Sequence, residues 1–404
     1  MAWTAGDRFN RAALWITVAL GFSIPVSTAL DGVLLAALLV CWLAGGRYRE
    51  KWIAVQGNGF ALAIGAFFLL HVAGSAYTIG STGAALDEIG KAAYMLLAPL
   101  LISLQPDAEW RRRALLALLA AVGLTLVLSF PIWLGVMPDL AFIKGQPVDA
   151  VVFKKKVGHS VLMAFGAFVL LLSARDRTGT KARVLLCLLA GLAAFNVTFM
   201  VWGRTGQVIL MALLAYFVIR SFGWRGVSAA AALALIAGAT VYFTPTSALH
   251  VRTAMTLDEI RSWQAHGRPN DDNMRLQTWT NSLELLKQRP LIGTGTGGFV
   301  AAYSRLIEGT SMAPADQPEN QYLLTAVQLG AVGLAALLAL FGFQWHLAAH
   351  LESRVDTDLA RGLVILMVVG CMFNSFLRDH SQALFYAWLS GLLYARPRTG
   401  AARA

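Results

Sequence analysis

Two sets of basic residues in apolar surroundings could carry chemistry. Lys154, Lys155 and Lys156 follow one another directly, and Arg204 stands between two apolar runs that leave almost no loop. Cationic side chains and helix N-termini are the natural ligands of phosphate. For the lysines, a basic patch against anionic lipid head groups is an equally good interpretation. For Arg204 we favour a phosphate site, because an arginine at the membrane edge has little else there to solvate it.

Glu319 is the carboxylate best placed for acid-base chemistry. It lies in Pro-Glu-Asn-Gln-Tyr, residues 318–322, at the start of a long apolar run. The helix dipole stabilises a carboxylate at a helix start, so a helix cap is the favoured interpretation from residue chemistry alone. The alternative is a general base at the boundary between membrane and water.

The composition defines the elements that must position these residues. Of the residues, 57% are hydrophobic and 14% are charged, and the net charge is +11. These values are typical of a polytopic membrane protein, and they exclude an ordinary soluble domain. We expect an all-α fold with about twelve spans. They lie near 12–30, 31–45, 58–77, 86–104, 114–135, 157–173, 183–202, 205–221, 226–243, 320–343, 359–376 and 381–395.

The spans divide the chain into three parts. Residues 1–243 hold nine spans, residues 244–318 form a polar segment, and residues 319–404 hold three spans and a tail. Most basic residues of the short loops fall on the side of the two termini, which predicts that side to be cytoplasmic. The polar segment then faces outward, which in a bacterium is the periplasm.

The polar segment should be mainly helical. Thr256 to Glu259 has the spacing of a capping box, and Asp271 or Asp272 can cap a second helix that ends near Arg289. On that helix one apolar stripe includes an arginine, which would need an anion or a local carboxylate as partner; its members are Arg275, Trp279, Leu283 and Leu286. Residues 299–307 form a third helix.

The glycine-rich sequence at 293–298 does not predict a nucleotide site. It lacks a preceding strand and the Lys-Ser/Thr pair of a phosphate-binding loop. We expect instead a tight turn whose backbone N–H groups approach a ligand. Arg378 and Asp379 of the last outer loop are expected to pair. The three cysteines lie far apart, so they predict neither a disulfide framework nor a metal site.

These motifs together resemble the O-antigen ligase and polymerase superfamily. The resemblance is carried by Pro-Leu-Ile-Gly-Thr-Gly-Thr-Gly-Gly-Phe at 290–299, Pro-Glu-Asn-Gln-Tyr-Leu at 318–323 and Gln-Leu-Gly-Ala-Val-Gly-Leu at 328–334. It implies a metal-independent, inverting glycosyltransferase of the bacterial inner membrane that needs no cofactor. The implied donor is a glycan on undecaprenyl diphosphate. The acceptor is lipid A-core for a ligase, or another carrier-linked repeat for a polymerase.

The resemblance also implies the site residues. Arg204 and Arg275 match the usual basic residues of the family, and Glu319 stands where many ligases have histidine. We therefore expect catalysis from Glu319, Arg204 and Arg275. Substrate binding is expected from Lys154, Lys155, Lys156, His159, Gln207, Asn320, Tyr322 and Arg378. The partners would be these substrates and membrane lipids, with no nucleic acid. A transporter of an anionic or lipid-linked solute is the rival from another class.

Overall fold

The computed structural model describes residues 4–138, 143–243 and 274–395, with residues 254, 257, 258 and 261 between the last two ranges. Within these residues the chain is helical and contains one isolated β-bridge but no strand. The N-terminal helices are α1 (Ala5–Val26), α2 (Thr28–Ala44), α3 (Tyr48–Gln56), α4 (Gly59–Ser75), α5 (Thr82–Ala92), α6 (Leu97–Leu104) and α7 (Ala108–Trp133). The later helices are α8 (Lys156–Arg175), α9 (Thr180–Phe195), α10 (Arg204–Phe222), α11 (Trp224–Phe243), α13 (Met274–Gln288), α14 (Phe299–Ile307), α15 (Gln321–Ala348), α16 (Arg354–Phe373) and α17 (His380–Tyr394).

Helices occur at all twelve places where spans are predicted. Among the described residues, six helices are long and apolar enough to cross a membrane, or seven if α2 and α3, which meet at 112°, form one bent span. The all-α class is therefore confirmed, whereas the count of twelve spans stays a prediction. One predicted span, 86–104, is broken into α5, a short 3₁₀ turn and α6.

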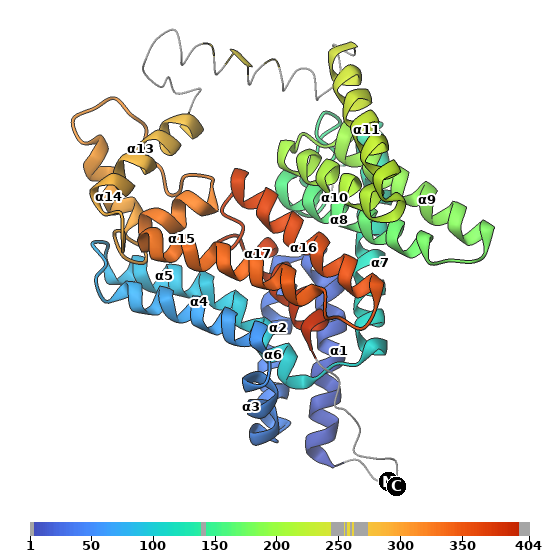
Figure 1. Cartoon of the computed structure of the whole chain (residues 1–404), viewed down its shortest axis with the longest axis horizontal. Helices are drawn as coiled ribbons and strands as arrows, with labels where there is room; N and C mark the ends of the chain where they lie inside the picture. Colours follow the sequence, from blue (N-terminus) through green and yellow to red (C-terminus); the bar gives the residue numbers. More distant parts are fainter. Residues whose placement is uncertain are drawn as a thin grey trace.

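The core of the bundle surrounds α17. Every residue of α17 from Ser381 to Tyr394 is buried, and the indole N–H of Trp388 donates to the carbonyl of Thr17 in α1 at 2.8 Å. In Figure 1, α13 and α14 lie together beside α15, and α9 and α11 lie on the other side of the molecule. The described helices of the polar segment, α13 and α14, thus pack at one side of the bundle.

The helix α13 confirms the second predicted helix of the polar segment, and α14 confirms the third, at residues 299–307. The predicted stripe on α13 is wrong. Its buried face carries Gln277 and Asn281, whose amides both donate to the hydroxyl of Tyr303 in α14. Polar side chains that bond across the interface, rather than apolar ones, set the face of α13. Thr256, Glu259, Asp271 and Asp272, on which the predicted helix starts depend, lie outside the described residues.

The glycine-rich turn fills a break in α15. The break is at Gly330, where φ is +66°, and it frees the carbonyls of Val327 and Gln328 from the helix. The N–H groups of Thr294 and Gly295 donate to these two carbonyls, each at 2.8 Å. The next two N–H groups of the turn bond to Gly74 and to the side chain of Gln328. The expectation that the turn offers its N–H groups to a ligand is wrong, because the protein uses them.

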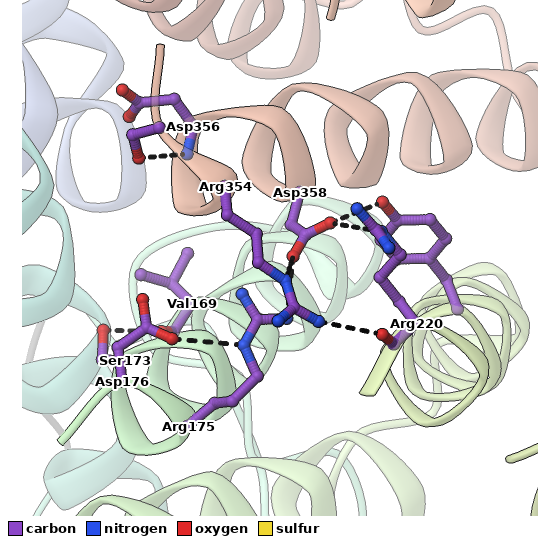
Figure 2. Close-up of polar contacts among 10 residues, drawn as sticks. Val169, Ser173, Arg175, Asp176, Arg220, Arg354, Asp356 and Asp358 are labelled. Carbon is purple, nitrogen blue, oxygen red and sulfur yellow. Dashed lines mark hydrogen bonds and ion pairs between the residues drawn. The ribbon is translucent and has the colours of Figure 1, made fainter. Parts of the chain in front are cut away.

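An ion cluster around one buried aspartate joins α8, α10 and α16 (Figure 2). Asp358 of α16 is fully buried and lies 2.7 Å from Arg175 of α8 and 3.3 Å from Arg220 of α10. The hydroxyl of Tyr216 donates to the same carboxylate at 2.9 Å. Arg175 ends α8, and the 20 residues of that helix span about 30 Å, roughly the thickness of a bilayer's hydrocarbon core. The cluster therefore fixes one end of α8.

Candidate functional site

A cavity of about 860 Å³ lies at the other end of α8. It is formed where α8, α13 and α17 begin, and it lies beside the start of α15 and the end of α16. Its charged and titratable lining residues come from separate parts of the chain: Lys144, Lys154, Lys155, Lys156, Arg275, Asp316, Glu319, Asp379 and His380. Five residues predicted from the sequence, Lys154, Lys155, Lys156, Arg275 and Glu319, are thus brought together.

The three lysines differ in their surroundings. Lys154 is buried, and its ammonium lies 3.6 Å from the carboxylate of Asp31 in α2. Burial lowers the pKa of Lys154, and the charge of Asp31 opposes that effect. Lys155 and Lys156 are exposed at the cavity. These two side chains are the ones that can contact a phosphate directly.

Two helix N-termini open onto the same cavity. The first residues of α8, from Lys156 to Gly158, and those of α17, from His380 to Gln382, line it. Within the described part of the chain, no side chain caps either helix start. The first-turn N–H groups of a helix lack partners within it and carry partial positive charge. With the lysines, they make this part of the cavity suitable for an anion.

Glu319 faces this cavity from the segment that leads into α15. The cap of that helix is Asn320, whose side-chain oxygen accepts from the N–H of Leu323 at 3.1 Å. The interpretation of Glu319 as the cap is therefore wrong. Glu319 has φ of +50°, a conformation that residues with a side chain rarely adopt, and its carboxylate accepts from the amide of Gln317. Strained backbone of this kind occurs preferentially at functional sites.

Asp379 is a further carboxylate in the cavity, and it was not among the site residues predicted from the sequence. Burial, together with the charge of nearby Glu319, raises the pKa of Asp379 to about 6. The predicted ion pair between Arg378 and Asp379 does not form, because Arg378 pairs with Glu88 instead. The guanidinium of Arg378 lies 2.5 Å from Glu88 of α5, so Arg378 does not line the cavity.

Arg204 lies next to the cavity without lining it. It begins α10, and the neighbouring Thr205 accepts a hydrogen bond from Asn374, a lining residue, at 2.9 Å. The side chain of Arg204 is exposed, as is that of Arg275. Both predicted arginines are therefore on the site's side of the bundle, and Arg275 is the one that borders the cavity.

Four other predicted binding residues make contacts within the protein. His159 is buried and bonds through one ring nitrogen to Asn196 at 3.0 Å. The side-chain amide of Gln207 donates to the backbone carbonyl of Thr198. The hydroxyl of Tyr322 donates to the backbone carbonyl of Val368. The side-chain amide of Asn320 donates to the carbonyl of Met372. The structure does not bring these four side chains into the cavity, where they would contact a substrate.

Asp31 is a charged residue near the site that the sequence analysis missed. It is fully buried in α2 and contacts Lys154 and His380, both of which line the cavity. A lone carboxylate in an apolar helix is costly and usually functional. That pattern, an aspartate within a predicted span, is the signal that could have found it. In the described ranges, no three His, Cys, Asp or Glu side chains gather as metal ligands would.

The fold and the cavity define a class of protein. Apolar helices long enough to cross a bilayer indicate a membrane protein, and its cavity at one end of α8 is lined by both basic and acidic side chains. Residues 189–338 match the model of a family described as O-antigen ligase. The match confirms the resemblance to the O-antigen ligase superfamily and supports a membrane glycosyltransferase of the ligase or polymerase type.

The other two comparisons add less. One similar solved structure is described as the structural coordination of polymerization and crosslinking by a peptidoglycan synthase complex. The similarity has a TM-score of 0.47 and 16% sequence identity, and it covers 83% of this chain and 95% of that one. The comparison with curated proteins gave no match.

Proposed function

We propose that this protein transfers O-antigen glycan from undecaprenyl diphosphate to lipid A-core, as an inverting and metal-independent glycosyltransferase. The observation that carries the proposal is the cavity in which Lys155, Lys156 and Arg275 meet the carboxylates of Glu319 and Asp379. Glycosyl transfer from a diphosphate needs both components. It needs cations that bind the departing diphosphate, and a base that accepts the proton of the attacking hydroxyl group.

The proposed step is a single displacement. The hydroxyl oxygen of the acceptor bonds to the anomeric carbon, while the bond from that carbon to the diphosphate oxygen breaks. The hydroxyl proton passes to Glu319, and the electron pair leaves with the diphosphate. Lys155, Lys156, Arg275 and the starts of α8 and α17 stabilise the charge of the leaving group.

The polyprenyl chain of the donor requires an apolar surface that continues from the cavity. The apolar helix α8 starts at the cavity and is long enough to cross a bilayer. A donor that lies with its diphosphate at the cavity and its chain among the membrane lipids fits this arrangement. We place the protein in the inner membrane, with the cavity on the periplasmic side, because the basic short loops predict that orientation.

A polymerase differs from a ligase in the acceptor alone, so it is the closest alternative. The test gives the purified protein an undecaprenyl-diphosphate-linked glycan in two tubes, one with lipid A-core and one without. Glycan that appears on lipid A-core alone, without added metal, supports the ligase. Longer carrier-linked glycan in both tubes identifies a polymerase. If neither tube contains product, glycosyl transfer is rejected, and the alternative hypothesis of a transporter is supported.

A further inference from the structure

The carboxylate of Asp31 has three partners from different parts of the chain. The hydroxyl of Ser23 in α1 donates to one oxygen. The other oxygen lies 3.2 Å from a ring nitrogen of His380 at the start of α17, and 3.6 Å from the ammonium of Lys154 just before α8. The helix dipole stabilises a carboxylate in the first turn of α2, but it does not require cationic partners.

Two of the partners of Asp31, Lys154 and His380, stand at the two helix starts that line the cavity. Lys154 precedes α8, and His380 is the first residue of α17. The two starts are neighbours, because a Cβ atom placed on Gly158 would lie 3.9 Å from the side-chain amide of Gln382. The imidazole of His380 also rests edge-on against the ring of Tyr94, with centroids 4.8 Å apart. Asp31 thus lies next to the starts of α8 and α17, and it contacts Lys154 at the first and His380 at the second.

We propose that Asp31 is a positioning residue for donor binding, which holds His380 and the lysine segment so that His380 contacts the diphosphate of the lipid-linked donor. The proposal rests on the proposed function for the identity of the donor. Three features support it: a buried carboxylate, an imidazole held by that carboxylate, and access of the imidazole to the cavity. An imidazole bonded to a buried carboxylate is fixed in orientation.

The test uses the full-length protein in nanodiscs and undecaprenyl diphosphate without glycan as the probe. We expect Asp31→Asn and His380→Gln each to weaken binding of the probe by about tenfold, as the loss of one charge-assisted hydrogen bond implies. The double variant should bind no more weakly than Asp31→Asn alone, because His380 contributes to binding only when Asp31 holds it. In the transfer assay, KM for the donor rises, while KM for lipid A-core stays unchanged.

Asp358→Asn is the matched control. Asp358 is also fully buried among cationic side chains, but it lies at the opposite end of α8 (Figure 2). A purely structural role of Asp31 predicts that both aspartate variants lose thermal stability and that neither changes affinity for the probe. That result overturns the proposal. If Asp31→Asn does not fold, His380→Gln decides the matter, and wild-type affinity in that variant also overturns the proposal.

The proposed function and this inference can fail separately. If the wild-type protein transfers no glycan but binds the probe through Asp31 and His380, the inference stands and the glycosyltransferase proposal fails. If the wild-type protein transfers glycan and both variants keep the wild-type affinity, the glycosyltransferase proposal stands and the inference about Asp31 fails.

Discussion

Gly330 and Leu291 approach so closely that the helix α15 and the glycine-rich turn form one unit. A Cβ atom at Gly330 would lie 2.1 Å from the carbonyl oxygen of Leu291, and Gly330 has φ of +66° and ψ of −162°. The break at this residue frees the carbonyls that hold the turn in place. The turn precedes α14 directly, so this contact positions α14 against the bundle.

Gly330→Ala should therefore destabilise the protein strongly. The substitution adds a backbone clash to a conformation that costs about 1–3 kcal/mol for a residue with a side chain. Thermal unfolding in detergent measures the effect. Gly342→Ala is the control in the same helix, because nothing lies within 4 Å of an added Cβ atom there. Equal unfolding temperatures for the two variants would contradict the role of the break.

Glu319→Gln should abolish most of the catalytic rate. A general base contributes about 10²–10⁴-fold, and the amide cannot accept the hydroxyl proton. We expect kcat to fall by that factor, with a smaller change in KM for the donor. Glu308→Gln is the control, because Glu308 is exposed and does not line the cavity. A Glu319→Gln protein with wild-type kcat would show that the base is elsewhere.

Asp379 should make stability depend on pH. Burial raises the pKa of its carboxyl from the ordinary 3.8 to about 6. The folded state therefore binds the proton more tightly than the unfolded state does, and the stability that this gives is lost as the pH rises through about 6. The substitution Asp379→Asn replaces the titrating carboxyl with a neutral amide, so the variant does not show this loss of stability with rising pH. The unfolding temperature of the variant minus that of the wild type should thus increase from about pH 4 to about pH 7. A difference that does not change with pH would contradict the buried carboxyl.

Asp358→Asn should cost far more stability than Asp176→Asn. Asp358 is fully buried and compensates Arg175 and Arg220, and the loss of one partner from a buried ion pair costs about 3–5 kcal/mol. Asp176 pairs with Arg175 at the surface, where such pairs contribute about 0–1 kcal/mol. Chemical unfolding measures both. Similar losses in the two variants would show that the cluster does not join the three helices.

The helices could be predicted from the sequence because membrane-spanning helices are defined locally. Long apolar runs place them, and proline and glycine residues interrupt them, so helices occur at all twelve predicted places. The face of α13 could not be predicted in this way. Gln277 and Asn281 are buried because the hydroxyl of Tyr303 accepts from both, and that contact joins residues more than 20 positions apart.

Some residues of the candidate site could be predicted from their type and position in the sequence, and others could not. Lys155, Lys156 and Glu319 were found because charge at the edge of a span is conspicuous. Asp31, Asp379 and His380 were not chosen, since their importance depends on the meeting of α2 and α17, which are far apart in the sequence. The same limit explains His159, which was expected to bind substrate but whose ring lies in the core.

The most direct test of the cavity as the site of glycosyl transfer compares two arginines of one segment. Arg275 begins α13 and lines the cavity, whereas Arg289 follows the end of the same helix and lines a different pocket. The measurement is kcat/KM for transfer from the undecaprenyl-diphosphate-linked donor. We expect Arg275→Ala to lower it by about tenfold or more, as the loss of a charged hydrogen bond to the diphosphate implies, and Arg289→Ala to leave it unchanged. Full activity of Arg275→Ala, in a protein that inserts and folds normally, would contradict the assignment.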